Sequence, residues 1–286
     1  MLLLTDFALH RPQSLGDVLD LRAELGDAAA LYAGGTELLL AMKMGVLDYE
    51  HLIDVKRVPE LHGIDSDGST LRIGATATHR DIETATAVRR DVPALAHLAA
   101  HVANVRVRAM GTLAGNLAFA EPHADPPALL VALGARVRLA GPARVRTVGV
   151  AEFIAGPYET ELGEDEVIEA IEVPVPAAGV RAAYRKFQVL ERPTVGVAAV
   201  GTVRDGAWAE APIVVVGAVD ERPLRVPADG LVGIACDDPA GLCEVEEAAR
   251  EVVDPVDDLS GGADYKRHLT GVLVRRTLAA LAEEGI

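Results

Sequence analysis

The chain has 286 residues, half of them hydrophobic, a composition that can bury a large core and predicts two or three packed units. Acidic residues outnumber basic ones by 43 to 27, and the formal net charge of -16 argues against binding to nucleic acid phosphates. No apolar run approaches the roughly 20 residues that span a bilayer. The first residues show no basic leader, so we expect a cytoplasmic protein without a membrane span.

The two cysteines, Cys236 and Cys243, lie seven positions apart, a spacing unlike the clusters that hold zinc or iron–sulfur centres. We therefore expect two reduced thiols and no metal site. No Ser-His-Asp, Cys-His or paired-carboxylate grouping stands out in the sequence, so no residue is assigned a catalytic role.

The chain begins with a helix–strand–turn–helix pattern. Apolar residues recur at helical spacing over residues 14–25, with Ser14 as a candidate N-cap and Gly26 as a candidate stop. Residues 29–33 are expected to form a buried strand that leads into a Gly-Gly turn, and helical spacing resumes over residues 37–44.

Strands are then expected at residues 52–55 and 71–74. Thr78 and Asp81 match a capping box, which predicts a helix after them. His79 lies inside that box and is interpreted as a solvated residue of the first turn.

The middle of the chain contains a predicted helix at residues 93–102, followed by residues 105–119, where Gly, Thr and Asn interrupt the periodicity and predict a loop. The Pro- and Gly-bearing run 174–179 is typical of a linker. Further elements are predicted as helices at 126–133, 241–253 and 265–281 and as strands at 135–139, 195–203 and 213–219.

The first candidate site is the Gly34-Gly35 turn, where a strand gives way to a helix. Two glycines allow backbone amides to converge on a phosphate, and the helix start adds partial positive charge. Strand-to-helix turns also use glycine for steric reasons alone, so the turn by itself leaves both interpretations open. Its spacing matches neither a Rossmann fingerprint nor a P-loop.

The second candidate site is the segment 108–116. Thr112 and Asn116 offer side-chain donors and acceptors, Gly115 permits close backbone approach, and Asp125 further on can accept hydrogen bonds from sugar or ribityl hydroxyls. The alternative is an unrelated loop, with Asp125 serving only as the cap of the helix that follows.

Together these segments resemble the FAD-binding medium subunits of the xanthine dehydrogenase and carbon monoxide dehydrogenase family. The similarity is most specific in the motifs Tyr32-Ala33-Gly34-Gly35-Thr36-Glu37-Leu38 and Gly111-Thr112-Leu113-Ala114-Gly115-Asn116, in this order, with Asp125 after them. It extends over nearly the whole chain, through the strand-to-helix junction 74–79, the pair Lys186-Phe187 and the last helix at 265–276.

The resemblance implies an α+β fold with a two-part, PCMH-like FAD-binding domain at residues 1–176, divided at about residue 57 into parts 1–57 and 58–176. A smaller C-terminal α+β domain would follow at residues 177–286. FAD would be bound non-covalently, because no histidine or cysteine sits in an attachment motif, and His123 is interpreted as a surface loop residue.

By the same resemblance, residues 33–38 would hold the diphosphate and adenosine portion of FAD, and residues 112–116 the diphosphate and ribityl chain. Asp125 would bind ribityl or ribose hydroxyls. The implied cofactor-binding residues are Tyr32, Ala33, Gly34, Gly35, Thr36, Glu37, Leu38, Val102, Gly111, Thr112, Ala114, Gly115, Asn116, Asp125, Ile168 and Lys186.

The sequence departs from the family pattern at two positions. Ala114 stands where the family has the first of two glycines, and Ala109 where an asparagine often follows the arginine. If residue 114 adopted a positive φ, alanine would cost about 1–2 kcal/mol there and lower the FAD affinity.

The implied function is electron transfer within a dimer of heterotrimers. A large molybdopterin-binding subunit would oxidise the substrate, a small subunit with two 2Fe–2S clusters would relay electrons, and FAD on this chain would deliver them to NAD, O2 or a quinone. Such a subunit should expose an apolar face to its partners. The alternatives are a scaffold subunit with a weak or vacant FAD site and a stand-alone flavin oxidoreductase.

Overall fold

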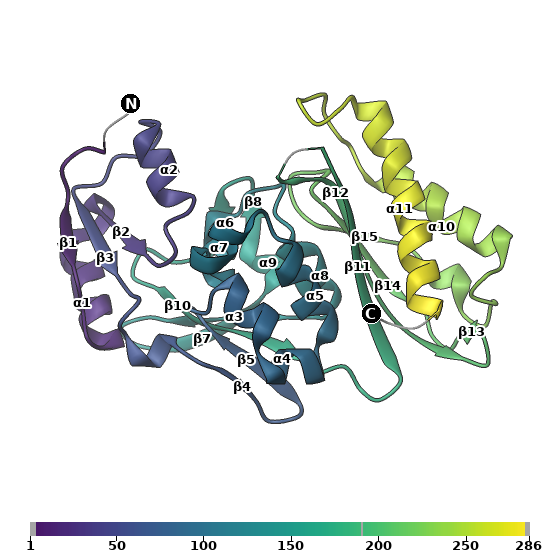
Figure 1. Cartoon of the computed structure of the whole chain (residues 1–286), viewed down its shortest axis with the longest axis horizontal. Coiled ribbons are helices and arrows are strands. Elements are labelled where there is room, and N and C mark those ends of the chain that lie inside the picture. The colour runs from purple at the N-terminus through teal and green to yellow at the C-terminus, as the bar shows by residue number, and fades with distance from the viewer. Residues whose placement is uncertain (1–3, 190, 284–286) are drawn as a thin grey trace.

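The computed structural model describes residues 4–189 and 191–283, which form three successive parts along the longest axis of the molecule (Figure 1). The predicted α+β class is confirmed. The outer ends of the predicted domains, residues 1–3 and 284–286, lie outside the described residues. Among the described helices, none is long and apolar enough to cross a membrane.

The N-terminal part is a small parallel sheet with two helices. Its elements are β1 (Ala8–His10), α1 (Leu15–Leu25), β2 (Ala29–Tyr32), α2 (Leu38–Lys43) and β3 (His51–Asp54). The strand order is β1-β3-β2. Helix α1 begins where predicted, because the Ser14 hydroxyl and the Asp17 carboxylate cap each other's backbone amides, and it ends at Gly26.

The middle part is an antiparallel sheet of order β4-β5-β10-β6-β7 with helices beside it. Its strands are β4 (Ile64–Ser66), β5 (Thr70–Gly74), β6 (Arg136–Ala140), β7 (Val145–Gly149), β8 (Ile154–Gly156), β9 (Glu159–Thr160) and β10 (Val167–Pro174). Its helices are α3 (His79–Thr84), α4 (Thr86–Asp91), α5 (Pro93–His101), α6 (Val105–Met110), α7 (Leu113–Phe119), α8 (Pro126–Ala132) and α9 (Val150–Phe153).

The prediction of a loop at residues 105–119 is wrong, because two short helices, α6 and α7, occupy it. The Asn104 side chain accepts hydrogen bonds from two amides at the start of α6, and Thr112 caps α7 through the amide of Gly115. The polar and glycine residues that interrupt the apolar periodicity are therefore caps and first-turn residues.

The C-terminal part is an antiparallel sheet covered by two long helices. Its elements are β11 (Val180–Gln188), β12 (Pro193–Arg204), β13 (Ala207–Trp208), β14 (Ile213–Gly217), β15 (Leu224–Val226), α10 (Pro239–Val252) and α11 (Ala263–Glu283). Residues 175–179 connect β10 to β11 where the linker was predicted.

Two apolar cores meet at this C-terminal sheet. One face, including Ala198 and Val215, belongs to the core of the first two parts, and α8 lies against it so closely that a side chain on Gly217 would contact Ala128. The other face packs with α10 and α11 and buries Trp208. The middle part and the C-terminal sheet are thus fixed against each other, which positions the residues that β11 contributes near the site.

Candidate cofactor-binding site

A cleft of about 430 Å³ lies between the N-terminal and middle parts. Its walls come from the β2–α2 junction, the segment from α6 to α7 and the start of β10. Fourteen of the sixteen predicted cofactor-binding residues line it, namely Ala33, Gly34, Gly35, Thr36, Glu37, Leu38, Val102, Gly111, Thr112, Ala114, Gly115, Asn116, Asp125 and Ile168. Segments up to 135 positions apart along the chain therefore converge on one cavity of ligand size.

The two remaining predicted residues, Tyr32 and Lys186, lie behind the lining. The Tyr32 ring packs beneath Gly35 and carries the Lys56 ammonium 3.4 Å from its centroid. Lys186 reaches Asp125 from β11. Both residues support the wall without lining the cavity.

The two glycine motifs touch each other. A side chain on Gly34 would collide with the carbonyl oxygen of Met110 and would lie 2.8 Å from the Cα atom of Gly111, closer than real Cβ atoms approach. Gly35 has a φ of +68°, which glycine adopts without strain. Glycine is needed at these two positions for space and for backbone conformation, respectively.

A run of free backbone amides follows this contact. Within the described part of the chain, the N–H groups of residues 34–38 donate no hydrogen bond, and the first helical one runs from Leu39 to Gly35 at 3.1 Å. Consecutive amides without partners bind anionic oxygens well. Because the net charge of the protein is -16, binding of an anion would depend on local donors such as these amides.

The second motif is anchored at its backbone. The carbonyl of Gly111 accepts from the amide of His79 at 3.0 Å, and Leu113 donates to Ala77 at 3.3 Å. Ala114 lies in the first turn of α7 and does not have a positive φ, so the expected conformational penalty does not arise. Gly115 is exposed, and a Cβ there would lie 2.8 Å from the capping hydroxyl of Thr112.

Two enclosed polar atoms in this wall lack a hydrogen-bond partner among the described residues, Nδ1 of His79 and Oδ1 of Asn116. The prediction that His79 is solvated is wrong, since its side chain is 2% exposed and lines the cleft. Burial, with the nearby charge of Arg108, lowers the pKa of His79 to about 4, so the imidazole is neutral at pH 7.

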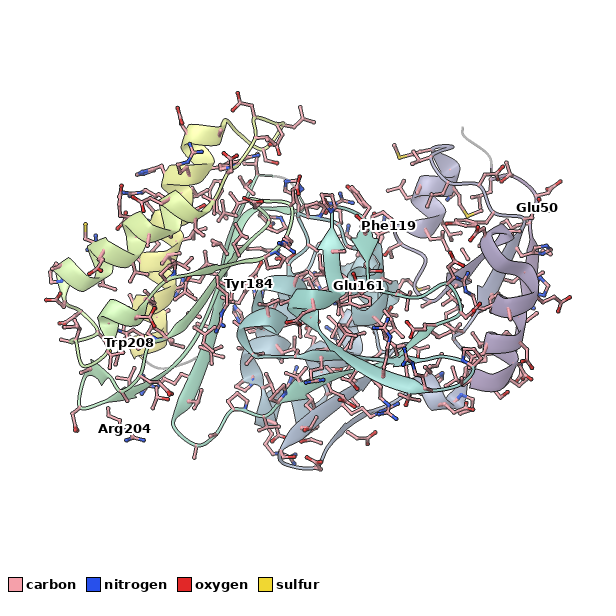
Figure 2. The ribbon with its side chains drawn as sticks, turned by 180° about the vertical axis from the view of Figure 1, so that it is seen from behind. Glu50, Phe119, Glu161, Tyr184, Arg204 and Trp208 are labelled. Carbon is pink, nitrogen blue, oxygen red and sulfur yellow. The ribbon has the colours of Figure 1, made fainter. Side chains whose placement is uncertain are left out.

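Asp125 is buried at the back of the cleft and is already engaged. The Tyr184 hydroxyl donates to it at 2.9 Å, and the Lys186 ammonium lies 2.9 Å from its Oδ1 atom. Burial raises the pKa of Asp125 against the opposing charge of Lys186. Figure 2 shows Tyr184 on the C-terminal sheet, where that sheet meets the middle part. Asp125 does not cap α8 with its side chain, so its interpretation as a cap alone is wrong. It lines the cleft, and its role toward sugar or ribityl hydroxyls stays a prediction.

An ion-pair cluster stands at the rim. Arg192 contacts Glu37 at 3.0 Å and Glu121 at 3.2 Å, which joins the loop before β12 to both the N-terminal and the middle part. Burial acts to raise the pKa of Glu121, but the hydrogen bond from His123 and the charge of Arg192 outweigh it, and the pKa lies below its usual value. His123, interpreted as a surface loop residue, lies in the turn before α8, is half-buried and lines the cleft.

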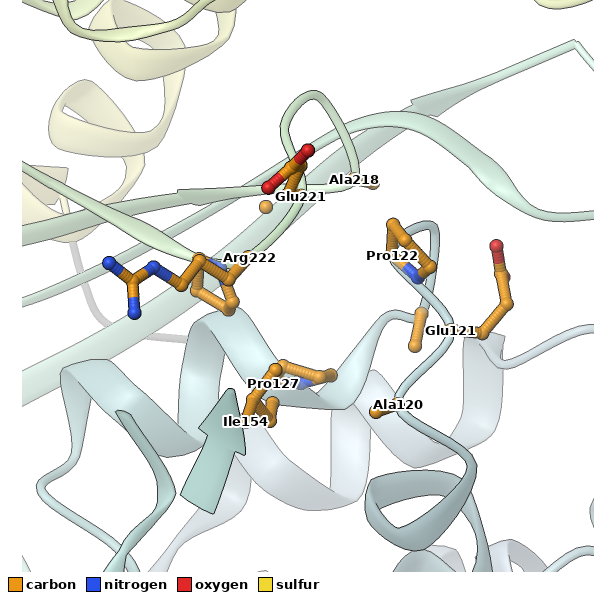
Figure 3. Close-up of a pocket in the computed structure, with 11 residues that line it drawn as sticks. Ala120, Glu121, Pro122, Pro127, Ile154, Ala218, Glu221 and Arg222 are labelled. Carbon is orange, nitrogen blue, oxygen red and sulfur yellow. The ribbon is translucent and has the colours of Figure 1, made fainter. Parts of the chain in front are cut away.

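The segment behind this rim is pressed against the C-terminal sheet. Figure 3 shows Ala120, Glu121 and Pro122 on one side of a small cavity and Ala218, Glu221 and Arg222 on the other. Its volume of about 10 Å³ suits at most one water molecule. Ala120 and Ala218 both have a positive φ, 47° and 63°, which places backbone strain where the two parts meet.

Comparison with known proteins identifies the family of the chain. Residues 5–176 match the family model described as "FAD binding domain in molybdopterin dehydrogenase". The carbon monoxide dehydrogenase medium chain of Hydrogenophaga pseudoflava is 37% identical over 291 residues, covering 96% of this chain and 96% of that protein. The chain belongs to the FAD-binding medium subunits of the molybdenum hydroxylases.

Solved structures agree with this assignment along the whole chain. A carbon monoxide dehydrogenase from Hydrogenophaga pseudoflava that lacks the Mo-pyranopterin moiety matches with a TM-score of 0.94 and 36% identity, over 99% of this chain and 100% of that one. Quinoline 2-oxidoreductase from Pseudomonas putida 86 matches with a TM-score of 0.93 and 31% identity, over 98% of each chain. The chain is thus an oxidoreductase subunit whose cofactor is FAD, and medium subunits of this kind work with large and small partner subunits.

The residues present suit this cofactor. Gly34 lets the two glycine segments touch, and the amides of residues 34–38 make no hydrogen bond within the described residues. Two enclosed polar atoms, Nδ1 of His79 and Oδ1 of Asn116, have no hydrogen-bond partner there either. Sequence reasoning missed His79, Glu121 and Arg192, whose place in the wall depends on contacts between distant segments.

Proposed function

We propose that this chain holds one FAD in the cleft and passes electrons from 2Fe–2S clusters of a partner subunit through it to an external acceptor. The observation that supports this most is the contact of the two glycine segments, which places the free amides of residues 34–38 beside the motif at 111–116. An extended dinucleotide needs such a pair of backbone surfaces around its diphosphate.

In this proposal, residues 33–38 bind the diphosphate and adenosine portion, and residues 112–116 bind the diphosphate and the ribityl chain. Val102 and Ile168 supply an apolar wall. Tyr32 acts indirectly by supporting Gly35, and Lys186 acts by fixing Asp125. Asp125 accepts hydrogen bonds from Tyr184 and Lys186, and a remaining lone pair of its carboxylate would accept a hydrogen bond from a ribityl or ribose hydroxyl of FAD.

FAD, when bound, supplies a redox centre that takes up electrons and releases them one or two at a time. The chain itself orients that centre and shields it. The neutral His79 adds no charge near the diphosphate, while Arg192, paired with Glu37 and Glu121, closes the rim with a guanidinium. No side chain of this chain needs to act as acid, base or nucleophile in such a relay.

The proposed assembly is a heterohexamer, a dimer of heterotrimers, in the cytoplasm, with NAD, O2 or a quinone as the acceptor. The proposed division of the chain places the FAD-binding domain at 1–176, in parts 1–57 and 58–176, and the C-terminal domain at 177–286. The family model, which matches residues 5–176, supports the boundary near residue 176.

Spectra of the purified chain and of its complex test the proposal. We expect a yellow protein that releases FAD on denaturation, and loss of flavin absorbance on adding substrate only when the partner subunits are present. Bleaching of the isolated chain by substrate would instead identify a stand-alone oxidoreductase. A colourless chain that cannot be reconstituted with FAD would identify a scaffold.

A matched pair of variants tests the site. Gly35→Ala and Gly45→Ala both place alanine at a similar positive φ, +68° and +70°, so both carry a similar backbone strain of about 1–2 kcal/mol. Gly35→Ala also presses its Cβ against the Tyr32 ring that supports the turn. Only Gly35 lines the cleft, whereas a Cβ on Gly45 meets open space. We expect Gly35→Ala to lose FAD and Gly45→Ala to keep it, and equal retention by both would contradict the site.

A further inference from the structure

His79 has a polar ring whose hydrogen-bonding capacity is unused. Its side chain is 2% exposed, yet its Nδ1 atom has no partner among the described residues. The other ring nitrogen, Nε2, also makes no hydrogen bond within the described residues, but it is not enclosed. Because the ring lines the cleft, a ligand there can reach Nε2, whereas Nδ1 stays without a partner.

The ring is held at the junction of the two glycine motifs. The backbone amide of His79 donates to the Gly111 carbonyl at 3.0 Å, and Thr78 and Asp81 fix the first turn of α3 by capping each other. A Cβ built on Gly111 would lie 3.6 Å from the His79 ring and 3.3 Å from the Thr36 hydroxyl oxygen. The imidazole, the Thr36 hydroxyl and the free amides of the first motif are therefore neighbours.

The protonation state of the ring decides which ligand groups it suits. Burial and Arg108 keep it neutral, so one ring nitrogen carries a hydrogen and the other a lone pair. The enclosed nitrogen is Nδ1, which leaves Nε2 as the ring nitrogen able to face the cleft. With the hydrogen on Nε2, the ring is an uncharged donor toward an anionic oxygen.

We infer that His79 is a direct ligand of FAD, donating a hydrogen bond from Nε2 to a diphosphate oxygen beside the amides of residues 34–38. The inference rests on the proposed FAD site and adds to it a residue outside both glycine motifs. Hydrogen bonds to charged groups are stronger than neutral ones, so losing this bond should weaken FAD binding by about 10- to 100-fold.

The test compares three variants of the full-length chain, stripped of flavin and titrated with FAD while flavin fluorescence is followed. His79→Phe keeps a buried ring without a donor, and His79→Gln places an amide N–H near the Nε2 position. His268→Asn removes an exposed histidine of α11 as a control. We expect FAD affinity to fall about 10- to 100-fold in His79→Phe, to recover at least partly in His79→Gln, and to stay unchanged in His268→Asn.

Competition by ADP identifies the part of the cofactor that is bound, because ADP carries the diphosphate without the flavin. We expect His79→Phe to weaken ADP by the same factor as FAD. An unchanged FAD affinity in His79→Phe, with a wild-type chain that binds FAD, would overturn this inference alone. A loss for FAD without a loss for ADP would overturn the diphosphate assignment, and a wild-type chain that binds neither would overturn the proposed site as well.

Discussion

Replacing Lys186 with methionine tests the buried polar group behind the cleft. The Lys186 ammonium lies 2.9 Å from Asp125 and donates to the His101 carbonyl at 2.7 Å, and the two charged side chains are 12% and 5% exposed. Among the described residues, the Asp125 carboxylate of Lys186→Met keeps the Tyr184 hydroxyl as its one hydrogen-bond partner. Removing one member of a buried ion pair costs about 3–5 kcal/mol of unfolding free energy.

In the variant, the loss of unfolding free energy cannot exceed the free energy needed to protonate Asp125, because the neutral carboxyl no longer needs a charged partner. This upper limit depends on pH. Protonating a carboxyl with an unfolded pKa near 3.9 costs about 1.4 kcal/mol for each pH unit above that value, or about 4 kcal/mol at pH 7 and about 1.5 kcal/mol at pH 5. The pKa of Asp125 is already raised by burial, and losing Lys186 raises it further. The folded variant thus takes up a proton as the pH falls, and the destabilisation should shrink.

Urea unfolding of the flavin-free chain at pH 7 and pH 5 measures both values. We expect Lys186→Met to lose about 3–4 kcal/mol at pH 7 and about 1–2 kcal/mol at pH 5. Adding Asp125→Asn removes the unpaired charge and keeps an acceptor for Tyr184, so the double variant should recover most of the loss at pH 7. A loss that is equal at both pH values, or that the second substitution deepens, would refute this reasoning.

Three further predictions concern the cleft. Gly34→Ala should force the two glycine motifs apart and weaken FAD binding by about 10- to 100-fold in a fluorescence titration, and retained affinity would exclude their contact as part of the site. Arg192→Gln breaks an exposed ion pair with Glu37 and leaves the buried Glu121 carboxylate with the His123 hydrogen bond, so the unfolding free energy in urea should fall by about 1–2 kcal/mol. Stopped-flow FAD release should become faster, and an unchanged release rate would argue against closure of the rim. The pKa of His79 is about 4 in the folded chain against 6.5 in the unfolded chain, so the unfolded state binds more protons between these pH values. The unfolding free energy should therefore fall by about 2 kcal/mol from pH 7 to pH 5, and His79→Phe should lack this contribution. The same dependence of unfolding free energy on pH in wild type and variant would contradict the burial of His79.

Local signals in the sequence predicted most of the secondary structure. Ser14 with Asp17 and Thr78 with Asp81 set the starts of α1 and α3, because a capping box is completed within one helical turn. The segment 105–119 failed for a related reason, since its caps lie among glycines that also favour loops. Helices of six or seven residues are too short to establish an apolar periodicity.

The predicted site residues came from the resemblance, and what they contact could not be read from the sequence. The partner of Asp125 lies 61 positions away on β11, and Arg192 reaches Glu37 across 155 positions. His79 gives only the local pattern of a first-turn residue, and its burial depends on the Gly111 carbonyl that its amide meets. For Ala114, the family pattern suggested a positive φ and a lower FAD affinity. The residue lies in a helix without a positive φ, so this penalty does not arise.

A crystal structure of the full-length chain with FAD tests the central claim most directly. The account predicts the diphosphate within hydrogen-bond distance of the amides of residues 34–38, against the turn at residues 111–116, with Nε2 of His79 donating to one of its oxygens. FAD bound at another surface, with this cleft left open, would contradict the account.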